Sequence, residues 1–180
     1  GHPVALPFIH SALSCGANSR SDRTHVRDHV TFLFRGQPVA LRDFPPTRSL
    51  LDWLREDRRA VGTKEGCNEG DCGACTVVLA RVEEGRLVHR PVNACITFLG
   101  MADGAELITV EDLAEGGRLH PIQQAMVDHH GSQCGFCTPG IVMSLFAMAK
   151  EGGEVDRNRI NDQLAGNLCR CTGYRPIVDA

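Results

Sequence analysis

The stretch Gly66-Cys67-Asn68-Glu69-Gly70-Asp71-Cys72-Gly73-Ala74-Cys75-Thr76 places three cysteines in a short, glycine-rich loop. Their spacing is C-x4-C-x2-C, and Cys95 follows at a distance along the chain. Glycines allow positive φ angles and close approach of the backbone, so such a loop can aim its N–H groups at sulfur atoms. The sequence therefore indicates a site where cysteine thiolates surround a metal centre.

The spacing favours one kind of metal centre over another. A tight loop with three ligands and a distant segment with the fourth can surround both irons of a [2Fe–2S] cluster. The pattern C-x4-C-x2-C followed by a distant cysteine is the plant-type ferredoxin spacing. A zinc ribbon is the alternative, but it normally shows two C-x2-C knuckles. We therefore predict a [2Fe–2S] site in this part of the chain.

The segments around this loop predict a small mixed sheet packed on one helix. Ser49 and Asp52 have the spacing of a capping box for a helix over 50–59, whose Trp53 we place in the core. Strand-like patterns, bounded by turn residues, occupy 30–34, 38–41, 76–80, 87–90, 94–99 and 107–110.

A second group of four cysteines combines C-x2-C with a later C-x-C: Cys134, Cys137, Cys169 and Cys171. The spacing alone fits an all-thiolate zinc site or a redox pair as well as a cluster. One helix is predicted to begin directly after the C-x2-C motif and another after the C-x-C motif, with Thr138 and Thr172 as N-caps. The positive ends of their dipoles would stabilise thiolates. Together with the neighbouring ferredoxin-type site, this placement favours a second cluster.

Beyond residue 111 the apolar residues recur with a helical period. We predict four helices. The first begins at Pro121, the second covers 138–150, the third covers 157–165 with Asp156 as N-cap, and the fourth follows Thr172. The second half is therefore expected to be helical, with its cysteines at helix ends.

The composition limits the remaining classes of protein. The chain has 180 residues, nine cysteines and a net charge of −3, which gives no reason to expect nucleic-acid binding. Its longest strongly apolar run, 140–149, is too short to span a bilayer. A disulfide scaffold is disfavoured because no secretory signal is visible and the cysteine count is odd. We expect a cytoplasmic protein, with residues 1–28 as a tail and Cys15 as a bystander thiol.

Three motifs resemble the iron–sulfur part of the molybdenum hydroxylases: the loop 66–76, the run Gln133-Cys134-Gly135-Phe136-Cys137-Thr138-Pro139-Gly140, and the run Gly166-Asn167-Leu168-Cys169-Arg170-Cys171-Thr172-Gly173-Tyr174. The stretches 50–57, 120–126 and 129–132 fit as well, so the resemblance covers about residues 29–180. Among these enzymes the chain is most similar to the small subunits of bacterial xanthine dehydrogenases. The motifs are specific for the family and less so for the substrate.

The resemblance implies an α+β chain with two domains. Residues 29–110 would form a β-grasp 2Fe-2S ferredoxin-like domain, and residues 111–180 would form an all-α four-helix 2Fe-2S-binding domain. The ligands of the first [2Fe–2S] cluster would be Cys67, Cys72, Cys75 and Cys95. The ligands of the second would be Cys134, Cys137, Cys169 and Cys171.

The resemblance also implies a role in electron transfer, with no catalytic residue in this chain. Substrate would be hydroxylated at a molybdenum–pterin site on a large partner subunit, with Gln133 and Cys171 beside the pterin. Electrons would pass through the helical-domain cluster and the ferredoxin-type cluster to FAD and NAD⁺. Because the sequence stops at Ala180 and shows no nucleotide-binding motif, molybdopterin and FAD are expected on partner subunits or on a further downstream domain.

Three other hypotheses stay open at this point. The chain could serve a sibling hydroxylase that acts on an aldehyde or on an N-heterocycle other than xanthine, since substrate contacts would lie on the molybdenum subunit. It could be a structural module with two zinc sites, which metal analysis would reveal. It could also be a free ferredoxin-like carrier that shuttles between enzymes.

Overall fold

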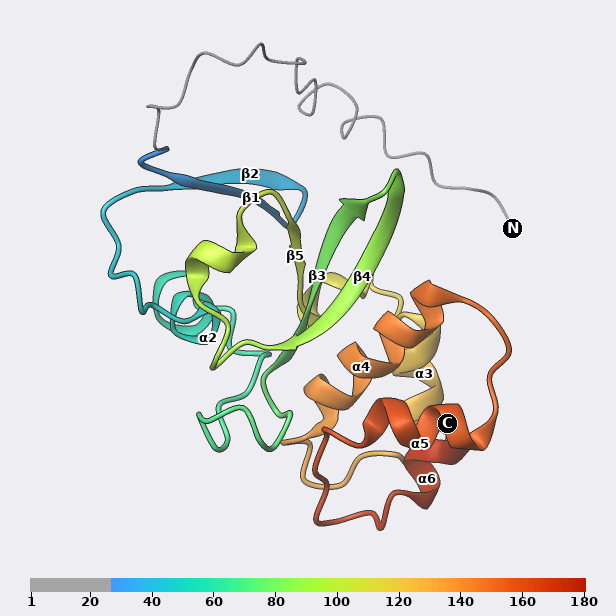
Figure 1. Ribbon diagram of the computed structural model, residues 1–180. Helices are drawn as coiled ribbons and strands as arrows, with labels where there is room; N and C mark the ends of the chain where they lie inside the picture. The colour runs from blue at the N-terminus through green and yellow to red at the C-terminus, as the bar shows by residue number, and fades with distance from the viewer. Residues whose placement is uncertain (1–26) are drawn as a thin grey trace.

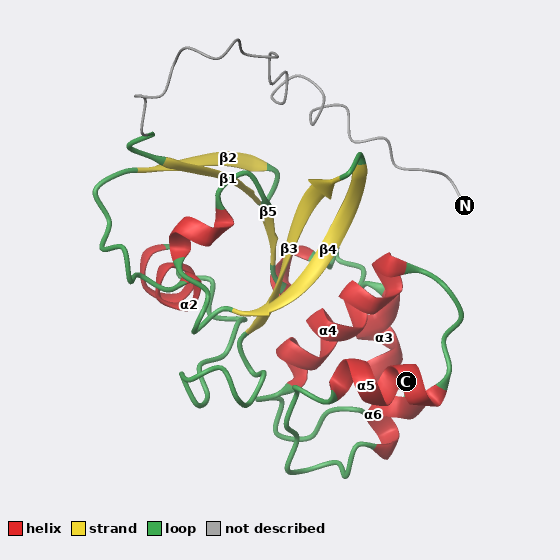
Figure 2. Cartoon of the chain, in the orientation of Figure 1, coloured by secondary structure: helices red, strands yellow, loops and turns green. Residues whose placement is uncertain are grey.

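The computed structural model describes residues 27–180. The tail predicted at 1–28 lies almost entirely outside the described residues, and Cys15 lies outside them as well. Figure 1 shows a sheet with a short helix beside it, followed by a group of helices that packs against strands β3 and β4. Figure 2 shows the same division by secondary structure, with every strand in the first half and most of the helical residues in the second.

The first half is a mixed five-stranded sheet with the strand order β2-β1-β5-β3-β4. Its strands are β1 (Val30–Phe34), β2 (Gln37–Leu41), β3 (Thr76–Glu83), β4 (Arg86–Asn93) and β5 (Glu106–Ile108). Strands β1 and β5 run parallel, and the other neighbouring pairs are antiparallel. The predicted mixed sheet packed on a helix is therefore confirmed.

The predicted helix over 50–59 is shorter and partly of another type. It consists of α2 (Leu50–Asp52) and a π-helical turn η1 (Trp53–Asp57). Ser49 caps it as expected, because its Oγ accepts a hydrogen bond from the backbone N–H of Asp52 at 3.0 Å. Trp53 is 2% exposed, which confirms its place in the core.

The strand predicted at 94–99 is wrong. The backbone N–H groups of Ile96 and Thr97 both donate to the carbonyl oxygen of Asn93, and Thr97 Oγ1 donates to the same oxygen. These local bonds curl the chain into a turn that carries Cys95, and the 3-10 helix η2 (Leu99–Ala102) follows. A nearly continuous run of apolar residues produced the strand-like pattern, but local bonds to the Asn93 carbonyl oxygen, from two backbone N–H groups and one side chain, decided the conformation.

Strand β3 is buried on both faces and serves two hydrophobic cores. Val77 and Leu79 point into the first core, where they lie with Trp53. Val78 points to the opposite face and belongs to the second core, together with Ile141 of the helical half. Successive side chains of a strand alternate between its faces, so one strand can complete both cores.

The second half is helical, as predicted. Its elements are η3 (Val110–Asp112), α3 (Pro121–Asp128), α4 (Thr138–Glu151), α5 (Arg157–Leu164) and α6 (Arg175–Asp179). Helix α4 is apolar nearly all round, since it packs on β3 and β4 on one side and on α3 and α5 on others. Across residues 27–180, none of the helices has both the length and the apolar character that crossing a membrane requires.

The cap residues differ in part from the prediction. Asp156 caps α5 as expected, because its Oδ1 accepts from the backbone N–H of Arg159 at 2.8 Å. Cys137, and not Thr138, is the N-cap of α4. Thr172 does not cap the last helix, whose N-cap is Tyr174 in the left-handed conformation with φ 67°. Thr172 instead accepts a hydrogen bond from the N–H of Tyr174 at 3.2 Å and thereby shapes the turn before α6.

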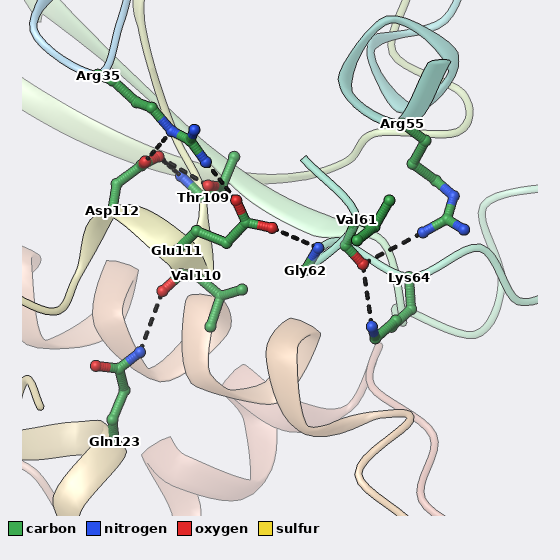
Figure 3. A network of polar contacts seen from close by, with 10 residues as sticks. All are labelled: Arg35, Arg55, Val61, Gly62, Lys64, Thr109, Val110, Glu111, Asp112 and Gln123. Atoms are coloured by element: carbon green, nitrogen blue, oxygen red, sulfur yellow. Dashed lines mark hydrogen bonds and ion pairs between the residues drawn. The ribbon is translucent and has the colours of Figure 1, made fainter. Parts of the chain in front are cut away.

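The segment between the two halves is tied to both of them (Figure 3). Glu111 accepts a hydrogen bond from the backbone N–H of Gly62 at 2.6 Å and forms an ion pair with Arg35. On the other side, Gln123 Nε2 of α3 donates to the carbonyl oxygen of Val110 at 3.1 Å. The predicted domain division between residues 110 and 111 falls inside η3 and stays a prediction.

Candidate metal centres

The first loop brings its cysteines together through backbone hydrogen bonds to sulfur. Cys67 Sγ accepts from the N–H groups of Asp71 and Cys72, both at 3.3 Å. Cys72 Sγ accepts in turn from the N–H of Cys67 at 3.3 Å. This pattern confirms the expectation that the loop aims its N–H groups at the thiols. Such bonds favour the thiolate, which is the form that binds metal.

The thiols of the first group lie in two pairs with different surroundings. Hydrogen bonds from the backbone N–H groups of Glu69, Cys72 and Asp71 lower the pKa of Cys67 to about 7, and the thiol of Cys72 contributes to the same effect. Burial raises the pKa of Cys75 to about 12, and the thiol of Cys95 beside it adds to the increase. Cys67 is thus paired with Cys72, and Cys75 with Cys95.

Glycines make the tight wrapping of this loop possible, but each does so in its own way. Gly66 does not need a positive φ. It is required because a Cβ at this position would lie 2.7 Å from Cys72 Sγ. Gly73 has φ +69°, and a Cβ there would lie 2.6 Å from Asn167 Nδ2. A cradle that leaves no room for a side chain beside the sulfur fits a cluster bound within it.

The second group is brought together in the same paired arrangement. The pKa of Cys134 is lowered by the N–H of Phe136 and by the thiol of Cys171. Burial and the neighbouring Cys169 raise the pKa of Cys137 to about 12. Cys134 and Cys171 are exposed, whereas Cys137 and Cys169 lie deeper. The second site therefore has one solvent-facing pair and one inner pair.

Tyr174 closes the loop that carries Cys169. Its hydroxyl accepts a hydrogen bond from the N–H of Cys169 at 2.7 Å and donates one to the carbonyl oxygen of Asn167 at 3.0 Å. Thr172 Oγ1 lies 3.3 Å from Cys169 Sγ. Sequence reasoning did not assign these roles. The one available signal was that the only tyrosine of the chain lies three residues after a ligand candidate.

The two loops meet each other directly. The N–H of Leu168, one residue before Cys169, donates to the carbonyl oxygen of Cys72 at 2.9 Å. At the start of α4, Gly140 lies so close to the backbone at Gly73 that a Cβ would be 3.1 Å from the carbonyl carbon of Gly73. Figure 1 shows the loop before β3 beside the beginning of α4. The loop of the first cysteine group therefore contacts the helical half through backbone atoms at two places.

The donor set fits two clusters of the predicted kind. The eight cysteines within residues 27–180 are free thiols, and the strongest thiol–thiol interactions within each group form two pairs. In a [2Fe–2S] cluster with four cysteine ligands, each iron takes two thiolates, which matches the pairs. Within residues 27–180, no three or more His, Cys, Asp or Glu side chains are arranged so that they could hold a single metal ion. Gln133 is exposed next to Cys134, and its predicted contact with a pterin stays a prediction.

Comparison with known families agrees with this geometry. The family described as "2Fe-2S iron-sulfur cluster binding domain" matches residues 34–100. The family described as "[2Fe-2S] binding domain" matches residues 109–180. The chain is thus a protein with two [2Fe–2S]-binding domains, a β-grasp domain followed by a helical one. This confirms the predicted fold class and cofactor type, and it decides against the zinc module.

The chain is also similar to proteins of known name. The chain is 47% identical to the xanthine dehydrogenase of Blastobotrys adeninivorans over 154 residues, which are 84% of this chain and 11% of that protein. It is 45% identical to aldehyde oxidase 1 of Rattus norvegicus over 154 residues, which are 84% of this chain and 12% of that protein. The chain therefore spans a small fraction of the length of these curated relatives.

Two solved structures share the fold. Quinoline 2-oxidoreductase from Pseudomonas putida 86 superposes with a TM-score of 0.73 at 35% identity, covering 84% of this chain and 88% of the matched chain. The aldehyde oxidoreductase from Desulfovibrio desulfuricans ATCC 27774 gives a TM-score of 0.72 at 36% identity, covering 85% of this chain and 16% of that one. The chain belongs to the iron–sulfur subunits and domains of the molybdenum hydroxylase family.

Proposed function

We propose that the chain is the electron-transfer part of a molybdenum hydroxylase, and that this enzyme is a xanthine dehydrogenase of the bacterial type, active in purine catabolism. The observation that carries the electron-transfer role is the direct contact of the two cysteine loops through Leu168 and Cys72. Two redox centres serve electron transfer only if they are close, and this contact brings their ligand loops within hydrogen-bonding distance.

Each cysteine group would hold one cluster. The first would be bound by Cys67, Cys72, Cys75 and Cys95, and the second by Cys134, Cys137, Cys169 and Cys171. When bound, a [2Fe–2S] cluster accepts and releases one electron at a time. The chain supplies thiolates, the N–H groups that stabilise their charge, and a fixed geometry, and it contributes no catalytic side chain of its own.

The exposure of the thiols supports a direction of electron transfer, from the second cysteine group to the first. Cys134 and Cys171 are exposed, and so is Gln133, which directly precedes Cys134, so this edge is the surface that we propose for the molybdenum–pterin subunit. The first loop would then face an FAD-bearing domain or subunit that passes electrons to NAD⁺. We also retain the domain division at 110/111 as a proposal, and a cytoplasmic location because nine thiols suit a reducing compartment.

Iron analysis and EPR spectroscopy test this proposal. The full chain, purified anaerobically, should contain about four irons and show two distinct [2Fe–2S] signals on reduction. A single signal, or zinc in place of iron, contradicts the assignment of two clusters. Co-purification of a molybdopterin-bearing partner would exclude the free carrier, and a stable iron-loaded chain that binds no such partner would favour it.

An aldehyde or N-heterocycle hydroxylase is the second candidate. The chain is nearly as similar to a protein named aldehyde oxidase 1, at 45% identity, as to a protein named xanthine dehydrogenase, at 47%. Assays of the complete enzyme with xanthine, an aldehyde and quinoline distinguish the candidates. Turnover of an aldehyde or quinoline without turnover of xanthine would overturn our choice of xanthine dehydrogenase.

A further inference from the structure

One buried amide, the side chain of Asn167, lies between the two cysteine groups. Asn167 is 4% exposed and precedes Cys169 by two residues. Its Nδ2 group donates hydrogen bonds to the carbonyl oxygen of Gly73 at 3.0 Å and to Oγ1 of Thr76 at 3.2 Å. The amide therefore links the chain next to Cys169 with the chain next to Cys72.

The other end of the amide is fixed by α4. Ser144 Oγ donates to the amide oxygen of Asn167 at 2.6 Å. Ser144 and Thr76 are as buried as Asn167, at 3% and 5% exposure. A buried polar network in which both ends of the amide are satisfied holds its members in one arrangement. Helix α4 thus orients the amide that grips the first loop.

The bonds of Asn167 lie directly beside the backbone bond between the loops. Gly73 follows Cys72, and Leu168 follows Asn167, so the amide-to-Gly73 bond and the Leu168-to-Cys72 bond are consecutive links. The carbonyl oxygen of Gly73 also accepts from Thr76 Oγ1 at 2.7 Å, which fixes it from the side of β3. Side chain and backbone together form a short ladder between the two ligand loops.

We propose that Asn167 is a positioning residue that sets the separation of the two cluster-binding loops. The inference rests on the proposed function, because it assumes that the eight cysteines hold the two clusters. A buried amide could instead serve only to fill space in the core and to pair with the polar groups buried there. Its position distinguishes the two roles, because both groups to which its Nδ2 donates belong to the first loop or to the strand that follows it, while Asn167 itself belongs to the second loop.

The test compares Asn167→Ala and the isosteric Asn167→Asp with Ser144→Ala in the iron-loaded full chain. Both Asn167 variants remove the donor to Gly73, whereas Ser144→Ala disturbs the same buried network and leaves that donor in place. Magnetic interaction between two reduced clusters splits their EPR signals and falls with the cube of their separation. The second readout is hydrogen exchange of the Leu168 amide, which does not depend on activity.

The expected result is specific. Both Asn167 variants keep two clusters, show a smaller splitting than wild type, and exchange the Leu168 amide about tenfold faster, because the neighbouring donor bonds are gone. Ser144→Ala keeps the Asn167 donor, so its splitting and its Leu168 exchange rate change less than those of either Asn167 variant. An Asn167 variant with two clusters, unchanged splitting and unchanged exchange would overturn the proposal. So would loss of a cluster in both Asn167 variants, since Asn167 would then determine assembly and not spacing.

Failure of the proposed function looks different. In that case the wild-type chain itself would lack four irons or one of the two EPR signals, before any substitution at Asn167 is made.

Discussion

Gly140, in the first turn of helix α4, lies against the carbonyl group of Gly73 in the first cysteine loop. A Cβ on Gly140 would lie 3.1 Å from the carbonyl carbon of Gly73 and 3.3 Å from that of Ala74, and closer still to the Gly73 oxygen. These neighbours are backbone atoms, so they cannot move aside as the end of a side chain can. The helical half can approach the loop this closely because residue 140 has no side chain.

We therefore expect Gly140→Ala to destabilise the protein by about 3 kcal/mol, in spite of the better helix propensity of alanine. Chemical denaturation of the full chain measures the loss. Gly166→Ala is the matched control, because a Cβ at Gly166 meets nothing within 4 Å. The control should stay within about 0.5 kcal/mol of wild type. Equal effects of the two substitutions would contradict the close contact.

The phenol of Tyr174 predicts a local effect on the second cysteine group. Tyr174→Phe removes the acceptor for the Cys169 N–H and the donor to Asn167 O, so we expect a loss of about 1–3 kcal/mol. Iron content and EPR should show weaker binding at the second site and normal binding at the first. Arg175→Ala, whose side chain is 88% exposed, serves as the control. Equal iron loss from both sites would speak against this role.

If the eight cysteines bind two clusters as proposed, replacing one of the more buried cysteines in each group should abolish one cluster at a time. Cys75→Ser is expected to lose the EPR signal of the first site, and Cys137→Ser that of the second. Each of these thiols interacts only with thiols of its own group. Iron content should fall by about half in each variant. Cys15→Ser should leave both signals intact. If Cys75→Ser removed both signals, the assignment of independent sites would fail.

Two histidines at the junction of the halves predict that acid weakens the fold. His89 of β4 and His120, the N-cap of α3, both lie edge-on to Phe146, with ring centroids 6.1 and 5.5 Å away. Burial, and secondly the charge of Lys150, lowers the pKa of both imidazoles. The unfolded chain then binds more protons, so this contribution to stability is complete above about pH 6.5 and is lost as the pH falls below it.

The thermal midpoint, measured from pH 7.5 downward, checks this expectation. The double variant His89→Gln and His120→Asn should lose less stability on acidification than wild type, because neither replacement titrates. Asparagine at 120 also keeps an N-cap acceptor in place of His120 Nδ1. Carboxyl groups are the same in both proteins, so the difference isolates the histidines. Identical slopes would show that their pKa values are not lowered.

The ion pair at the linker predicts a moderate loss of stability. Glu111→Ala removes both the pairing with Arg35 and the acceptor for the Gly62 N–H. Because Arg35 and Glu111 are partly exposed, we expect about 1 kcal/mol by urea denaturation. Glu115→Ala, an exposed glutamate in the same segment, should have little effect. A loss at Glu115 as large as that at Glu111 would contradict the proposed link.

Local sequence signals predicted much of the fold. The turn residues and apolar runs placed four of the other strands, whereas the one predicted at 107–110 ends at Ile108 and Val110 begins η3. Side-chain caps such as Ser49 and Asp156 placed two helix starts. These succeed because capping and alternation act between residues close in the chain. The cysteine spacing grouped eight thiols into two sets, and the structure brings each set together. The assignment of these thiols as cluster ligands stays a prediction.

The errors arose where other contacts competed with the local pattern. Cys95 was placed on a strand, but Thr97 bonds back to Asn93 and bends the chain. Thr172 has the chemistry of an N-cap, yet it supports a turn in which Tyr174 takes a left-handed conformation. The contact of Asn167 with Gly73 joins segments far apart in sequence, and no periodicity could reveal it.

Strand β3 has a consequence for how this chain can be recombined with its relatives. Val78 completes the core of the helical half, although it lies in the other sequence domain. In a chimera that joins the sheet of one protein to the helices of another near residue 110, the helical core therefore packs against a β3 side chain from a different parent. Such hybrids should fold best when position 78 and the face of α4 opposite it come from the same parent. The two halves therefore pack as one unit, and we expect exchange of one half alone to lower the stability of the fold.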